Sequence, residues 1–179
     1  MAITEEKKLE PIINFASKDF VVEVDNTVLA LACLVGLLDG KRYPDRSSEK
    51  NWILKTEVSY YEIGTKKLLL LPCELFPELA FGGALDSDAS ATGKGAEVNP
   101  PLLCDITGDK EILIFGLAND EIGYVLPPND FILNEKSPYL ENGRDKFDRR
   151  HYEETNSVGP KTAAAIAAAV SDLMELVKE

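Results

Sequence analysis

Short apolar runs separated by turn-forming residues predict a chain that mixes strands with helices. Residues 20–24 are rich in β-forming side chains and predict a strand, and the apolar run at 112–115 is long enough for one buried strand. Residues 52–61 alternate between apolar and polar, and the run at 66–71 predicts the second arm of a β-hairpin. Because residues 68–71 are all leucine, we expect this second arm to be central in its sheet and covered on both faces.

Two segments carry helix signals. Asp25 and Asn26 can accept hydrogen bonds from exposed amide groups and predict a helix over residues 27–38, with Gly40 as its C-cap. This helix is apolar nearly all round, which predicts burial on several sides. A final helix is predicted over residues 163–177, where an alanine-rich first half allows close approach to a sheet.

These elements predict one α/β domain over residues 1–179, a mixed β-sheet packed with helices. The length suits one domain, and a hydrophobic content of 45% supplies material for a core. The polar residues 1–10 predict a flexible lead-in. Residues 82–101 are rich in Gly, Ala, Ser and Asp, and they predict a long flexible surface loop.

The charge balance narrows the classes of partner. A formal net charge of −12 argues against a nucleic-acid binder, which needs a basic surface, and against electrostatic docking on an anionic membrane. It suits a cation held among carboxylates, although a solvated acidic surface is the commoner explanation. Residues 1–8 lack the apolar core of a signal peptide, and the longest apolar stretch, residues 28–38, is too short to span a bilayer. We therefore expect no transmembrane segment and, by default, a cytoplasmic protein.

The cysteines and the histidine limit the metal chemistry. Cys33, Cys73 and Cys104 are widely spaced and form no CxxC motif, so reduced thiols are expected. His151 is the one histidine of the chain. A zinc site with two or more histidines therefore cannot come from this chain alone.

Polar side chains follow two of the predicted strands. Since strand ends that carry polar side chains build sites in α/β sheets, we expect these residues to converge, Glu74 and Tyr124 above all. Four of the candidates also have a purely structural explanation. Glu74 could be a first-turn carboxylate, Tyr124 a core ring, His151 a surface imidazole and Tyr152 a packing aromatic. No GxSxG or HExxH motif is present. The candidates for chemistry are Glu74, Asn119, Asp120, Tyr124, His151 and Tyr152.

Three motifs occur in an order that resembles one known family. They are LLLLPCE at 68–74, FGLANDEIGYV at 115–125 and YEETNSVG at 152–159. Together they resemble the neutral (non-lysosomal) ceramidases and their bacterial relatives. The resemblance covers the carboxyl-terminal part of that family's catalytic domain, roughly residues 20–179 here, and it implies the distal half of a ceramidase-like α/β domain.

The resemblance implies roles for three residues. Glu74 and Tyr124 would be zinc ligands, completed by two histidines from the amino-terminal part of the family's domain. Tyr152 would be the catalytic tyrosine that polarises the scissile amide. Zinc would activate a water for attack on the linear amide of an N-acyl sphingoid base, a lipid-like substrate.

The sequence departs from the family pattern at several positions. Cys73 replaces the motif glycine, and Glu154 and Thr155 stand where glycine and alanine are expected. The stretch between Tyr124 and Tyr152 is longer than in the family, and the portion with the histidines is missing. We therefore expect the chain alone to be incomplete or inactive: half of a larger enzyme, a split subunit that needs a histidine-bearing partner, or a relative that has lost the chemistry.

Two other functions remain open. A non-catalytic binding or assembly module would keep the fold and expose an apolar face, covered by a partner half or by homo-oligomerisation. An unrelated enzyme could use Cys73 or Cys104 as its nucleophile. That enzyme would need a lowered thiol pKa and a base nearby, for which only His151 is available.

Overall fold

The computed structural model of the chain describes residues 6–37, 42–43, 52–83, 85–95 and 100–178. These residues form a mixed α/β fold with four α-helices, one five-stranded sheet and two small two-stranded sheets. The expected class, mixed sheet with helices, is confirmed at this level. Among the helices so described, none is long and apolar enough to cross a membrane.

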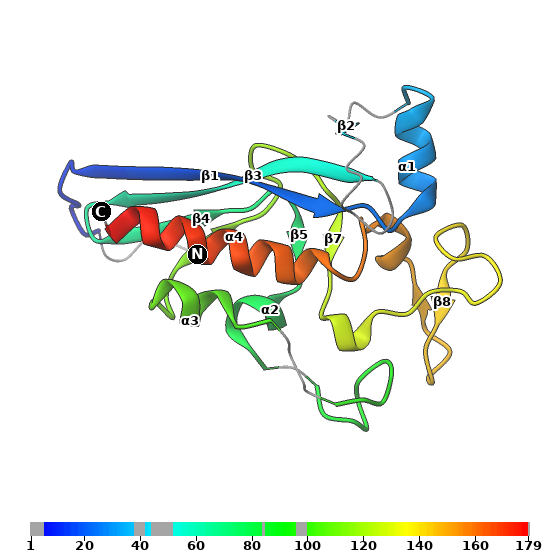
Figure 1. Ribbon diagram of the computed structural model, residues 1–179. Helices are drawn as coiled ribbons and strands as arrows, with labels where there is room; N and C mark the ends of the chain where they lie inside the picture. Colours follow the sequence, from blue (N-terminus) through cyan, green and yellow to red (C-terminus); the bar gives the residue numbers. More distant parts are fainter. Residues whose placement is uncertain (1–5, 38–41, 44–51, 84, 96–99, 179) are drawn as a thin grey trace.

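Two long antiparallel strands are the centre of the main sheet (Figure 1). β1 (Ile13–Glu23) pairs along its whole length with β3 (Ile53–Ile63), which turns into β4 (Lys66–Leu70). β4 in turn pairs in parallel with β6 (Leu113–Phe115). The short strand β2 (Arg42–Tyr43) pairs with β3, and the order of the other four strands is β1-β3-β4-β6.

One face of this sheet is covered by the carboxyl-terminal helix. α4 (Thr162–Lys178) runs along β1 and β3, and Figure 1 shows it lying against one side of the sheet. Its small side chains allow the close approach that the alanine pattern predicted. α3 (Leu103–Thr107) packs on α4, and α2 (Pro77–Phe81) packs on α3. The helix residues buried against the sheet include Ala163, Ile166, Ala167, Val170 and Leu173.

The remaining elements gather beyond the ends of β4 and β6. They are short, because this part of the chain is rich in prolines, glycines and polar side chains. They are β5 (Glu74–Leu75), β7 (Tyr124–Val125), the 3₁₀ helix η1 (Pro128–Asp130), β8 (Gly143–Arg144), β9 (Arg150–His151) and the 3₁₀ helix η2 (Glu154–Asn156).

The hairpin, the last helix and the start of the first helix are confirmed. α1 (Thr27–Leu34) begins after Asn26, whose Oδ1 accepts from the backbone N of Val28 at 3.0 Å and of Leu29 at 3.1 Å. The first strand is longer than predicted because β1 starts at Ile13 rather than at residue 20. Its first half carries polar side chains at exposed positions, so the sequence there lacks the signal of a buried strand.

The prediction that the first helix is buried on several sides is wrong. Only Ala30 of α1 is buried, and Leu31 and Leu34 are about 60% exposed, at 59% and 63%. Figure 1 shows α1 standing beyond the end of β1 rather than against the sheet. The helix also ends earlier than predicted, at Leu34, and the proposed cap Gly40 lies outside the described residues.

Two predictions about strand burial are also wrong. β6 is an edge strand, and its Leu113 and Phe115 are 49% and 50% exposed. β4 is central in the sheet, yet Leu68 and Leu70 are only partly buried, because they point away from α4. The apolar runs therefore predicted the strands correctly. They did not show that the apolar side chains on one face of the sheet are left partly exposed.

The described part of the 82–101 loop contains no helix or strand, although part of it is held in place. Ser90 is fully buried, and its Oγ accepts from the backbone N of Gly93 and of Gly95 at 3.1 and 3.2 Å. Asn129 Nδ2 donates to the carbonyl oxygen of Gly95 at 2.7 Å. Residue 84 and residues 96–99 lie outside the described part, as do residues 1–5 of the lead-in.

Candidate functional site

The chain segments that follow β4 and β6 run side by side, and this brings two of the candidate residues together. The backbone N of Leu71 donates to Phe115 O at 2.8 Å, and the N of Ile122 donates to Pro72 O at 2.8 Å. The two segments then form the parallel ladder of β5 with β7, in which Glu74 is the direct partner of Tyr124. The side chains of Glu74 and Tyr124 thus lie together, as expected from the two strand ends.

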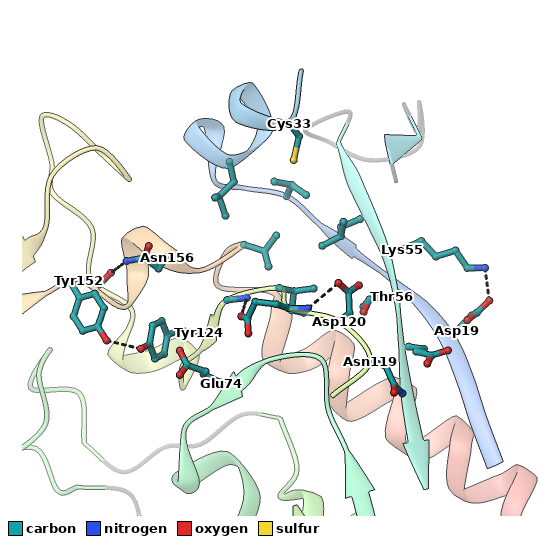
Figure 2. A pocket seen from close by; sticks show the side chains of 18 residues that line it. Asp19, Cys33, Lys55, Thr56, Glu74, Asn119, Asp120, Tyr124, Tyr152 and Asn156 are labelled. Carbon is teal, nitrogen blue, oxygen red and sulfur yellow. Dashed lines mark hydrogen bonds and ion pairs between the residues drawn. The ribbon is translucent and has the colours of Figure 1, made fainter. Parts of the chain in front are cut away.

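A third candidate, Tyr152, lies in the segment just before η2. Gly123 forms an antiparallel bridge with Ser157, so the residues around η2 lie against the start of β7. The hydroxyl oxygens of Tyr124 and Tyr152 are 2.6 Å apart, and their rings meet edge to face with centroids 5.4 Å apart (Figure 2). A carboxylate and two phenols therefore converge from three separate parts of the sequence.

This contact raises the pKa of Tyr124. The hydrogen bond with Tyr152 is the largest cause, and the hydrogen bond with the Glu74 carboxylate adds to it. A phenol that donates to a carboxylate loses that bond on ionisation, so Tyr124 stays neutral at neutral pH. The group facing the solvent is the ring of Tyr152, which is 45% exposed.

Asn119 and Asp120 border the same cavity. Asn119 adopts a positive φ of 69°, an uncommon conformation for a residue other than glycine, and its Nδ2 donates to Ser59 Oγ at 3.2 Å. Asp120 Oδ1 accepts from the backbone N of Glu121 at 2.9 Å. Both residues line the cavity that also reaches Glu74, Tyr124 and Tyr152.

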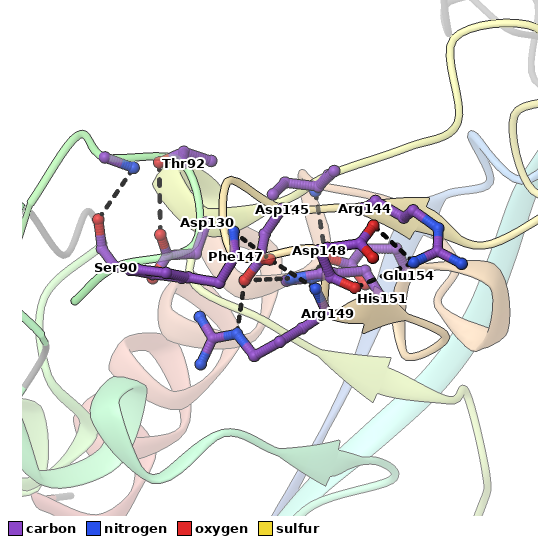
Figure 3. Close-up of polar contacts among 12 residues, drawn as sticks. Ser90, Thr92, Asp130, Arg144, Asp145, Phe147, Asp148, Arg149, His151 and Glu154 are labelled. Carbon is purple, nitrogen blue, oxygen red and sulfur yellow. Dashed lines mark hydrogen bonds and ion pairs between the residues drawn. The ribbon is translucent and has the colours of Figure 1, made fainter. Parts of the chain in front are cut away.

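His151 takes part in a different network. Its Nδ1 is 2.8 Å from Oε1 of Glu154, and its Nε2 is 3.6 Å from Oδ2 of Asp145 (Figure 3). Both carboxylates are fully buried. Burial acts to raise the pKa of Asp145, but hydrogen bonds from Arg149 and Phe147 lower it to about 2. His151 does not line the cavity, so it is not a base for a reaction there.

Sequence reasoning missed the two buried carboxylates beside His151. The mixed charges around residues 149–154 were a signal for this network, but the pairing depends on the β8–β9 ladder, which joins Gly143 to His151. Two-residue strands of this kind leave no hydrophobic period in the sequence. In the sequence, Glu154 stands out only as a departure from the ceramidase pattern.

The thiols do not meet the requirements of a nucleophile. Cys73 is fully buried, and burial, followed by the charges of Glu121 and Glu74, raises its pKa to about 12. Cys104 is also buried, in α3. Because a reactive cysteine needs an exposed thiol with a lowered pKa, the hypothesis of a Cys73 nucleophile is wrong.

The convergent groups fit part of a zinc site. Glu74 offers a carboxylate oxygen that zinc accepts, whereas Tyr124 is a neutral phenol that must lose its proton to bind as a phenolate. Structural and catalytic zinc sites also need three or four protein ligands. Within the described residues there is no group of three or more His, Cys, Asp or Glu side chains placed to hold a metal ion. Further ligands would therefore have to come from another segment.

The site opens into a cavity of about 840 Å³ between α1, β3 and β7. Figure 2 shows Tyr124, Tyr152 and Glu74 at one end of it, with Cys33 of α1 far from them. Apolar side chains line the part near α1, and these are Val24, Leu29, Cys33 and Leu54. The cavity thus combines a polar end with an apolar wall, which is the usual composition of a small-molecule site.

Comparisons of the chain with protein-family models, with curated proteins and with solved structures found no match.

Proposed function

We propose that this chain is the distal part of a zinc-dependent hydrolase of linear amides, of ceramidase type, which is inactive until a histidine-bearing segment completes its metal site. Glu74 and Tyr124 supply two ligands, and Tyr152 is the catalytic tyrosine. The imidazole ligands come from a partner half. The substrate class is an N-acyl sphingoid base or a similar lipid-like amide.

The observation that carries this proposal is the convergence of Glu74, Tyr124 and Tyr152. The three residues come from three motifs that are far apart in the sequence and that resemble the ceramidase pattern in their residues and their order. The β5–β7 ladder makes Glu74 and Tyr124 direct partners, and 2.6 Å separates the two tyrosine hydroxyls.

Each of the three residues has a defined task in this chemistry. When bound, zinc supplies the acidity that turns water into a nucleophile at neutral pH and polarises the amide carbonyl. Glu74 provides the negative charge that retains the cation, and its contact with Tyr124 holds the phenol toward the same point. Tyr152 donates a hydrogen bond to the amide oxygen as negative charge develops there.

The cavity supports a substrate with a long apolar part. Its polar end holds the three site residues, and its wall near α1 is made by Leu29, Cys33 and Leu54. An acyl or sphingoid chain can lie on this wall while the amide reaches Tyr152. Removal of such a chain from water provides binding energy of about 0.8 kcal/mol for each buried methylene group.

The half-site can be tested on the chain as it stands, with Co²⁺ as a spectroscopic probe for zinc and free imidazole in place of the missing ligands. We expect imidazole to strengthen Co²⁺ binding to the native chain. Glu74→Gln and Tyr124→Phe should each weaken that binding by about 10-fold, since each removes one of the two protein ligands. Glu121→Gln is the matched control, because Glu121 lines the same cavity without being a proposed ligand. Equal Co²⁺ affinity in all four proteins would refute the metal site.

Catalysis is tested on the chain reassembled with its histidine-bearing partner. Tyr152→Phe should retain the zinc content and lower the kcat for N-acyl sphingosine hydrolysis by about 10²- to 10³-fold, as expected for loss of one oxyanion donor. A reassembled complex that binds zinc but hydrolyses no linear amide would contradict the proposed reaction.

A second function, a binding or assembly module without catalysis, is favoured by one observation. The sheet face opposite α4 and the helix α1 expose apolar side chains that a monomeric protein normally covers, including Phe15, Phe115 and Leu34. This surface is compatible with both functions. Metal binding in the assembled complex separates them, because a pure assembly module has no reason to bind zinc through Glu74.

A further inference from the structure

The two faces of the main sheet differ in what covers them. Lys18 of β1 forms an ion pair with Asp172 of α4 at 3.3 Å, which assigns Lys18 and its alternate neighbours to the covered face. Its cross-strand partner Val58 is fully buried there. The residues between these positions, beginning with Ile13 and Phe15, must therefore point to the opposite face.

The opposite face carries a continuous apolar surface across four strands. Cross-strand registers place Phe15 beside Tyr61, Tyr61 beside Leu68, and Leu68 beside Leu113. Phe15, Leu113 and Phe115 remain 57%, 49% and 50% exposed. We name this surface the open sheet face, and its apolar residues are Ile13, Phe15, Val21, Tyr61, Ile63, Leu68, Leu70, Leu113 and Phe115.

The open sheet face leads into the candidate site. Toward the far end of β1 and β3 it becomes polar, where Asp19 lies directly opposite Glu57 and pairs with Lys55 (Figure 2). These residues line the same cavity as Glu74, Tyr124 and Tyr152. Between the apolar part and these polar residues, Ser59 is 1% exposed and accepts a hydrogen bond from Asn119 Nδ2, so the segment around Asn119 covers the face at that point. A layer placed on the open sheet face would therefore reach the cavity edge past Asn119, which also lines the cavity.

The charges that line this cavity indicate what kind of partner surface can bind beside it. Five carboxylates and one lysine line it: Asp19, Glu57, Glu74, Asp120, Glu121 and Lys55. A second copy of this chain, with its net charge of −12, would bring like charges together, and an anionic membrane would be repelled in the same way. The complementary occupant carries cationic or imidazole side chains beside an apolar surface.

We infer that the open sheet face is the docking surface for a second polypeptide layer, a β-sheet of a different chain. Its apolar side chains pack over Phe15, Leu113 and Phe115, and its basic or histidine side chains lie over Asp19 and Glu57. Sheets pack face to face about 10 Å apart, and the regular spacing of the exposed apolar positions matches such a layer. The inference rests on the proposed function in one respect, which is that the same layer brings the imidazole ligands.

The experiment is site-specific photocrosslinking of the full chain in its source cells. A benzophenone amino acid replaces Phe15 or Phe115 on the open sheet face, or Leu176 on α4 as the control, since Leu176 is 46% exposed in the helix that covers the other face. We expect positions 15 and 115, but not 176, to crosslink to one polypeptide. Its crosslinked peptide, sequenced by mass spectrometry, should alternate apolar residues and carry Lys, Arg or His. Crosslinks to lipid, to a second copy of the chain, or equally from all three positions would overturn the inference.

A variant series separates docking from folding. Phe115→Lys and Asp19→Lys should reduce recovery of the crosslinked partner from position 15 by at least 10-fold, while Leu176→Lys leaves it unchanged. Urea unfolding of the isolated variants should show that each still folds, because the three side chains are exposed in the chain alone.

Failure of the docking surface and failure of the zinc site give different results. If the crosslinked complex binds no zinc, the proposed function fails and the docking surface stands. If a complex binds zinc through Glu74 while positions 15 and 115 do not touch the partner, the docking surface fails and the proposed function stands.

Discussion

Glu154 has a fully buried side chain with two hydrogen-bonding contacts on one oxygen. Its Oε1 accepts from the backbone N of Ile132 at 3.1 Å and lies 2.8 Å from Nδ1 of His151. Its Oε2 is buried and has no hydrogen-bond partner among the described atoms. Burial raises the pKa of Glu154, and the bonds from Ile132 and His151 oppose that rise. This carboxylate joins three segments just beside Tyr152.

The first prediction follows from these contacts. Glu154→Ala should lower the free energy of unfolding by about 2–4 kcal/mol, because it leaves the Ile132 N–H and the His151 ring without their acceptor. Glu154→Gln keeps an oxygen at the Oε1 position and should cost about 1 kcal/mol. Urea unfolding measures both. Glu135→Ala, at an exposed position of the preceding loop, is the control and should change stability by less than about 0.5 kcal/mol. Similar values for Glu154→Ala and Glu135→Ala would show that the network contributes little.

At the scale of elements, the site depends on how closely η2 approaches β7. Gly123 has a φ of 87°, and a Cβ at this position would lie 1.9 Å from the carbonyl oxygen of Asn156. Only glycine permits this approach. The contact sets the position of Tyr152 relative to Tyr124, because Tyr152 precedes η2 and Tyr124 follows Gly123.

Gly123→Ala should therefore separate η2 from β7. We expect a loss of stability about 2 kcal/mol larger than for Gly108→Ala, together with loss of the tyrosine contact. Gly108 is the matched control, since it also has a positive φ, 65°, but open space around its Cβ position. Gly108→Ala reports the cost of the backbone conformation alone, about 1 kcal/mol. Thermal unfolding compares the two variants, and the change in Tyr fluorescence reports on the pair. Equal losses would mean that the close approach is not rigid.

The elements also show what the sequence reveals and what it leaves out. Hydrophobic period and cap residues were sufficient for the β3–β4 hairpin, for α4 and for the start of α1, because each is a local signal. The sequence did not reveal that Asn26 also donates from Nδ2 to Thr155 O and Ser157 O, at 3.0 and 2.9 Å. Nor did it reveal the exposure of α1 and β6, because an apolar run looks the same whether it is covered by its own chain or by another.

The candidate site was predictable to a similar extent. The two predicted strand ends were enough to expect Glu74 near Tyr124, and the structure places both beside Tyr152. Their roles as zinc ligands and catalytic tyrosine stay predictions. The contact of Tyr152 with Tyr124 depends on the bridge between Gly123 and Ser157, a long-range pairing for which no local pattern exists.

At the scale of the whole molecule, two groups buried in the core, a thiol and a phenol, make the free energy of unfolding fall at alkaline pH. Cys73 and Tyr60 belong to the core cluster, and burial is the largest cause that raises the pKa of each to about 12. Their ordinary values are 9.0 and 10.0. Between these values and about 12, the unfolded chain releases protons that the folded chain retains, so a rise in pH favours unfolding. The stabilising contribution is complete below pH 9.

We expect the free energy of unfolding to fall steadily between pH 9 and pH 12. At pH 10, one unit above its ordinary pKa, Cys73 alone should account for a loss of about 1.4 kcal/mol. Urea unfolding at pH 8 and pH 10 measures this loss. Cys73→Ala removes the titrating group: it lowers stability at both pH values through the cavity it leaves, yet its decrease from pH 8 to pH 10 should be about 1.4 kcal/mol smaller than that of the native chain. The same decrease in both proteins would mean that the Cys73 thiol reaches solvent and titrates in the folded state.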